Sequence, residues 1–138
     1  MMAAITEINQ ILVKAVQDGS FGLDIAFENI KFNPKGKTAY IALFNLRSPT
    51  IMAELGPMGC DLHTGIMQID VNYEQGGGID ELLEKADAIN AIFKNGATFA
   101  GANENVNITN VSALPAVISR GWATVSMTIE YYVFSQRV

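Results

Sequence analysis

The chain has 138 residues, of which 49% are hydrophobic and 17% charged, a balance typical of one globular domain and unlike that of a disordered chain. Fourteen acidic against nine basic residues give a formal net charge of -5, which argues against a protein whose main task is to bind nucleic acid phosphates. The single cysteine, Cys60, excludes an intrachain disulfide, and neither a secretory signal pattern nor a long unbroken apolar run is present. We therefore expect a single domain spanning residues 1–138, soluble in the cytoplasm.

The N-terminal segment, residues 3–18, is predicted to form an amphipathic helix that ends at Gly19. Its apolar residues recur at helical spacing with polar residues between them: Ile5, Ile8, Leu12 and Val16. A short apolar stretch follows, and Pro34 and Gly36 then mark a turn.

Residues 38–46 are predicted to form a strand whose two alternating faces are both apolar, as in a strand that is covered on both sides. The long connection after it, residues 48–59, is unusually apolar and contains Ile51, Met52, Leu55 and Met58. Long loops in compact domains are usually functional or disordered, and methionine-bearing apolar surface suits adaptable contact with another protein. We interpret this segment as a contact hairpin; the alternative is a loop folded back onto its own core.

Residues 67–73 alternate between apolar and polar side chains, which predicts a half-buried strand. The glycine run at residues 76–78 matches neither phosphate-binding spacing, and Asp80 and Glu81 in the next helical turn would repel a phosphate. We therefore expect a simple connection to a second amphipathic helix that stops at Gly96. Its predicted apolar stripe consists of Leu82, Leu83, Ala86, Ile89 and Phe93.

Residues 106–111 and 125–133 are predicted to be paired strands, with Trp122 opening the last one. The resulting order predicts an α+β fold, a mainly antiparallel sheet with two amphipathic helices packed on one face. Two helices cannot cover both faces of five or six strands. The second apolar face of residues 38–46, with Ile66 on the outward side of the neighbouring strand, therefore suggests that another subunit covers part of the sheet.

Reactive side chains gather at Cys60, Asp61 and His63. One cysteine and one histidine are too few for a typical zinc site, and three residues along a loop rarely form a nucleophile–base pair. We expect a loop with a buried thiol and no catalytic, metal-binding or cofactor-binding residues. The competing interpretation is a small α+β enzyme or ligand-binding domain that uses Cys60 and His63.

The order of several short motifs resembles that of the tail-terminator proteins of long, non-contractile-tailed bacteriophages, the lambda-type minor tail family. The matching residues span nearly the whole chain: Glu28, Asn29, Phe32, Pro34, Tyr40, Gly65, Gln68, Asp70, Val71, Phe93, Gly96, Gly121 and Trp122. The three-glycine run departs from the more mixed loop that such proteins often carry, and the 48–59 segment does not align.

This resemblance implies a virion structural protein without enzymatic activity. Its relatives assemble as a hexameric ring on the last ring of the tail tube, stop tube polymerisation and present a surface for head completion proteins. The implied partners are further copies of the chain, the tail tube protein and a head completion or neck protein, with no specific nucleic acid and no membrane. The implied location is the virion tail, after assembly in the host cytoplasm. Another phage neck or head-tail completion protein is the alternative within the same class.

We expect the 48–59 hairpin and the sheet edge at residues 40–46 to contribute to ring or tube contacts. The candidate interface residues are Tyr40, Phe44, Ile51, Met52, Leu55, Met58 and Ile66.

Overall fold

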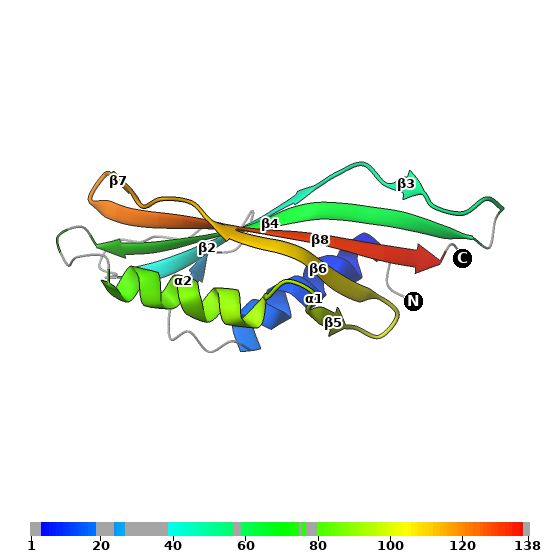
Figure 1. Ribbon diagram of the computed structural model, residues 1–138, viewed down its shortest axis with the longest axis horizontal. Coiled ribbons are helices and arrows are strands. Elements are labelled where there is room, and N and C mark those ends of the chain that lie inside the picture. The colour runs from blue at the N-terminus through cyan, green and yellow to red at the C-terminus, as the bar shows by residue number, and fades with distance from the viewer. Residues whose placement is uncertain are drawn as a thin grey trace.

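The computed structural model describes residues 4–18, 24–26, 39–56, 59–74, 76 and 80–136. Within these residues the chain forms two helices and an eight-stranded, mostly antiparallel sheet (Figure 1). The fold class predicted from the sequence, α+β, is thereby confirmed. The predicted turn with Pro34 and Gly36 and the candidate residue Met58 lie outside the described residues.

Helix α1 (Ala4–Asp18) confirms the first predicted helix. Ile8, Leu12 and Val16 are buried, as their spacing predicts. Ile5 is half exposed, so its inclusion in the buried stripe is wrong, and Glu7 is buried instead. Glu7 lies under the loop at residues 101–104, a neighbour that helical spacing cannot reveal.

Two long hairpins build the sheet. In the first, β2 (Ala39–Arg47) and the short β3 (Ile51–Met52) both pair antiparallel with β4 (Cys60–Glu74). In the second, β6 (Asn105–Ala113) and β7 (Val117–Ser119) both pair antiparallel with β8 (Trp122–Gln136).

The central strands β4 and β8 pair along their whole length, from Cys60 opposite Gln136 to Glu74 opposite Trp122. Each strand has 15 residues, and at the usual rise per residue this makes the sheet about 50 Å long. The order across the sheet is β1-β2-β4-β8-β6-β5. At its two sides, β1 (Asp24–Ala26) pairs parallel with β2, and β5 (Thr98–Ala100) pairs antiparallel with β6.

Helix α2 (Asp80–Ile92) lies on the same face of the sheet as α1 (Figure 1). Leu82, Ala86, Ile89 and Phe93 are buried, but Leu83 is 43% exposed, so its place in the predicted stripe is wrong. The apolar inner face of the sheet packs against the two helices, with these sheet residues at the centre: Ile41, Leu43, Met67, Ile69, Val71, Val106, Ile108, Val125, Met127 and Ile129.

The predicted 67–73 strand begins seven residues earlier, at Cys60, so the Cys60 to His63 segment lies in a strand and the loop expected there is wrong. Its inward-facing positions include Asp61, His63 and Gly65, which hide the apolar alternation that marks a strand. Trp122 opens the last strand, as predicted. Neither helix is long and apolar enough to cross a membrane, within the described part of the chain.

Candidate assembly interface

The outer face of the sheet is the side that points away from both helices (Figure 1). Side chains alternate between the two faces of a strand, and residues directly opposite in an antiparallel pair share a face. The register therefore places rows of residues side by side on the outer face. One row contains Phe44, Gln68 and Thr128, and the next contains Leu46, Ile66 and Glu130.

The middle of the outer face is polar. Its side chains are largely satisfied by one another: Gln68 Nε2 donates to Asp70 Oδ1 over 2.9 Å, and the Thr124 hydroxyl donates to Asn72 Oδ1. The hydroxyl oxygens of Ser112 and Thr128 are 2.7 Å apart. This region forms a hydrated surface that does not need a partner to satisfy its polar groups.

The end of the outer face near β3 is apolar. Here Leu46 lies opposite Ile66, and Ile51 and Phe134 lie on either side of Leu62. We call this set the apolar patch: Phe44, Leu46, Ile51, Leu62, Ile66 and Phe134. Leu46, Ile51 and Phe134 each expose more than half of their surface, at 57%, 57% and 56%. A contiguous exposed group of this kind is characteristic of a protein-contact surface.

The hairpin that joins β2 to β4 projects beyond the sheet at the same end (Figure 1). The amides of Ala53 and Glu54 donate to the carbonyl of Cys60, and the Cys60 amide donates to Glu54 Oε1. Met52 and Leu55 point into solvent, and Leu55 is 89% exposed. The described apolar side chains of this hairpin are thus not folded back onto the core.

Tyr40 lies on the outer face but far from the apolar patch. Its ring packs edge-on against Trp122, with ring centroids 5.0 Å apart. Burial, and then the negative charge of Asp70, raises the pKa of the Tyr40 hydroxyl above its ordinary value. Tyr40 is therefore neutral at physiological pH and belongs to a separate aromatic pair at the other end of β2.

The structure consequently divides the predicted interface residues into three groups. Phe44, Ile51 and Ile66 join the apolar patch, Met52 and Leu55 lie at the hairpin tip, and Tyr40 stands apart. Leu46 lies within the predicted contact edge at residues 40–46 but was not among the candidate residues, and the sequence interpretation missed Leu62 and Phe134. Each of them is apolar in the sequence, but only the strand register shows that they lie on one face of the sheet.

A groove of about 730 Å³ runs between α1 and the outer edge of β2. Strand β1 pairs only with residues 40–42 of β2, and among the described residues no strand pairs with the edge at Leu43–Arg47. Lys14 and Arg47 contribute the cationic groups of the groove, beside Asp18 and the amides of Asn9, Gln10, Gln17 and Asn45. Phe44 also lines it, so the groove adjoins the apolar patch.

Cys60 and His63 project from opposite faces of β4, because their positions differ by an odd number of residues. His63 Nδ1 is 3.1 Å from the Thr50 hydroxyl oxygen. A thiol and an imidazole on opposite faces cannot form the nucleophile–base pair of a cysteine hydrolase. The described residues also contain no group of three or more potential metal ligands of the His, Cys, Asp and Glu types.

The family model described as "Phage tail terminator protein" matches residues 7–131. A solved structure covers 91% of this chain and 94% of its own chain with a TM-score of 0.69 and 19% sequence identity, which establishes a shared fold alone. The search of curated proteins finds no match.

Proposed function

This chain belongs to the phage tail terminator protein family, and from that premise we propose that it caps the tail tube, ends tube polymerisation and forms the surface for head joining. The family is one of structural proteins, and the chain is a component of the virion tail. We propose that it works as a single domain, assembled in the host cytoplasm, and that its partners are the tail tube protein and a head completion or neck protein.

The observation that carries this proposal is the uncovered outer face, with the apolar patch and the exposed hairpin at one end. The polar middle of this face can stay in contact with water, whereas the apolar patch is the part that contact with another protein would bury. The hairpin holds Met52 and Leu55 away from the core, in a position to reach a neighbouring protein.

We further propose that the assembled form is a hexameric ring, as in the proteins that the sequence resembles. Closed rings use two different patches on each subunit, which suits a molecule with distinct surfaces at its two ends. Sedimentation velocity over a wide concentration range should then detect a species near six times 14.9 kDa, about 89 kDa. A chain that assembles only on the tube end would remain monomeric in this experiment.

The direct test uses purified tail tubes that lack a terminator. Adding the protein should arrest tube elongation, measured as a narrow length distribution by electron microscopy. Met52→Asp should lower attachment to these tubes at least tenfold, since an unpaired carboxylate would be buried in the contact. The melting temperature should barely change, because Met52 is exposed in the free chain.

Met52→Leu is the matched control, because it keeps the apolar surface and should cap normally. Normal capping by Met52→Asp would exclude the hairpin tip from the contact. Failure of the wild-type chain to bind tube ends, combined with binding to isolated head connectors, would favour the neck or head-tail completion role instead.

A further inference from the structure

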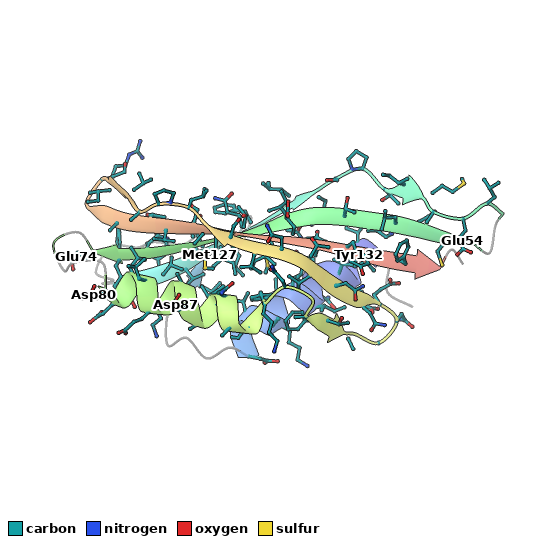
Figure 2. The ribbon with its side chains drawn as sticks, viewed as in Figure 1. Glu54, Glu74, Asp80, Asp87, Met127 and Tyr132 are labelled. Atoms are coloured by element: carbon teal, nitrogen blue, oxygen red, sulfur yellow. The ribbon has the colours of Figure 1, made fainter. Side chains whose placement is uncertain are left out.

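The two hairpin tips lie at opposite ends of the sheet, and both curve away from the helices (Figure 1). One tip follows β3 and carries Glu54, which Figure 2 places at the far end of the molecule. The other is the two-residue turn Arg120–Gly121 between β7 and β8. The length of the central strands separates the tips by about 50 Å.

The Arg120 turn is unusual in its backbone. Arg120 has φ of 52° and Gly121 has φ of 82°, so both turn residues adopt left-handed conformations. Two-residue hairpin turns of this type favour Asn-Gly, and an arginine at the first position is strained relative to asparagine. Strain at an exposed position is a reason to look for a role of the side chain outside the fold.

Arg120 is exposed, and no described carboxylate lies within ion-pair distance of it. Val117 and Ile118, in the strand that leads into the turn, are exposed, and Leu114 is exposed in the segment before that strand. The turn itself thus carries one cation, next to exposed apolar side chains of the adjoining strand.

The opposite tip has the same construction with the opposite charge. Its exposed aliphatic residues are Ile51, Met52 and Leu55, and its carboxylates are Glu54, which is exposed, and Asp61, which is half-buried on the adjoining strand. Both tips therefore expose apolar surface, and their charges are opposite in sign.

Contacts between like tips would place equal charges together, two arginines at one end or two acidic groups at the other. Contact between unlike tips pairs Arg120 with a carboxylate. Glu74 and the acidic first turn of α2 lie at the Arg120 end, so this end is not positive as a whole, and the guanidinium acts as a local point of recognition.

We propose that the Arg120 turn of one copy docks on the Glu54 hairpin tip of a second copy, in a head-to-tail contact that repeats around the assembly. This inference rests on the proposed self-assembly and names the residues that make its contact. Each subunit then extends along the circumference, and six of them would close a ring of roughly 95 Å diameter at its centre line.

The first test compares variants of the turn. Arg120→Asn removes the charge and suits the turn better, so its melting temperature should equal or exceed that of the wild type while self-association weakens at least tenfold. Arg120→Glu and Glu54→Lys should each give monomers in sedimentation velocity. The double variant Arg120→Glu/Glu54→Lys should restore the assembled species, because it reverses the pair.

Disulfide crosslinking tests the same contact even if the chains associate only weakly in solution. In the triple variant Glu54→Cys/Arg120→Cys/Cys60→Ser, mild oxidation should produce a ladder of linked oligomers that ends at the closed ring. The variants Glu54→Cys/Cys60→Ser and Arg120→Cys/Cys60→Ser have one cysteine each. They should give no product larger than a linked dimer, because each chain can form only one disulfide.

Wild-type assembly by Arg120→Asn, or the absence of a ladder in the triple variant, would overturn the head-to-tail contact. Tube capping is measured in a separate experiment, so failure of the tip contact can be distinguished from failure of the proposed capping function. A chain that crosslinks tip to tip but never arrests tube growth retains the contact and refutes the proposed function. A chain that caps tubes but does not crosslink tip to tip supports the proposed function and refutes the head-to-tail contact.

Discussion

Gly65 lies in β4 at the point where the Tyr131 side chain crosses the inner face of the sheet. A Cβ atom at Gly65 would lie 2.6 Å from Tyr131 Oη and 2.8 Å from its Cζ. The Tyr131 hydroxyl donates to Asn45 Oδ1 over 2.7 Å, and Asn45 Nδ2 donates to Asn9 Oδ1 over 3.4 Å. Because Gly65 has no side chain, there is room for a chain of hydrogen bonds that connects β8, β2 and α1. This chain lies on the opposite face of the sheet from the apolar patch.

Gly65→Ala should therefore destabilise the fold by about 1–3 kcal/mol, because both Tyr131 and its partner Asn45 are buried and cannot easily move aside. The free energy of unfolding in urea measures this change. Thr64→Ala, the neighbouring position on the outer face, is the control and should change stability by less than about 0.5 kcal/mol. An alanine at position 65 that is equally well tolerated would contradict the predicted close contact.

Between elements, a buried carboxylate connects α1 to the loop that joins β5 and β6. Glu7 Oε2 accepts hydrogen bonds from the amides of Asn103 and Glu104 at 2.8 and 2.6 Å, and Oε1 accepts one from Asn103 Nδ2. The Glu104 carboxylate in turn accepts a hydrogen bond from the Ser135 hydroxyl near the end of β8. Three segments distant in sequence are held together by side-chain polar contacts at this point.

These contacts make the stability of the fold dependent on pH. The Asn103 amide is the strongest of the hydrogen bonds that lower the pKa of Glu7 below its ordinary value of 4.5. A carboxylate with a lowered pKa in the folded state stabilises the fold above its unfolded pKa, and the contribution is lost as pH falls through the folded value.

Glu7→Gln should accordingly be less stable than the wild type at neutral pH, and the difference should shrink as pH falls below 4.5. Urea midpoints measured from pH 7 to about pH 3 test this dependence. Glu84→Gln on the exposed face of α2 controls for loss of one negative charge. A constant difference between Glu7→Gln and wild type across this range would show that Glu7 does not titrate as proposed.

At the scale of the molecule, charge is unevenly distributed over the two faces. The outer face carries the carboxylates of Asp70, Glu74 and Glu130. The described cations lie elsewhere, on the helices, in the groove beside β2, in the segment after α2 and at the hairpin turn: Lys14, Arg47, Lys85, Lys94 and Arg120. Together with the net charge of -5 this makes the outer face repulsive to phosphate groups.

We therefore expect no measurable binding of duplex DNA at physiological salt, with a dissociation constant weaker than about 10⁻⁴ M. Fluorescence anisotropy with a labelled duplex tests this, and a titration at low salt shows whether any attraction is purely electrostatic. In an assembled ring, such a surface would let DNA pass without adhering. Tight binding at physiological salt would contradict the proposed role of the acidic face.

Local patterns in the chain were sufficient for the order and type of most elements. Helical spacing predicted α1 and α2. Alternation predicted residues 67–73 of β4 and 125–133 of β8, because the apolar side chains of these segments face a core formed by the same chain. The prediction weakened where the sheet extends past the helices. There the inward positions of β4 carry Asp61, His63 and Gly65, and no apolar alternation marks the strand.

The sequence by itself determined the α+β class, the two helices, the family resemblance and the excess of apolar residues in one exposed hairpin. Only the tertiary structure placed Leu46, Ile66, Leu62 and Phe134 in one patch, separated Cys60 from His63 and buried Glu7 beneath a distant loop. Periodicity records whether a side chain points inward or outward along its own element. Which residues then meet depends on strand register and on contacts between segments far apart in the chain, which no local pattern encodes.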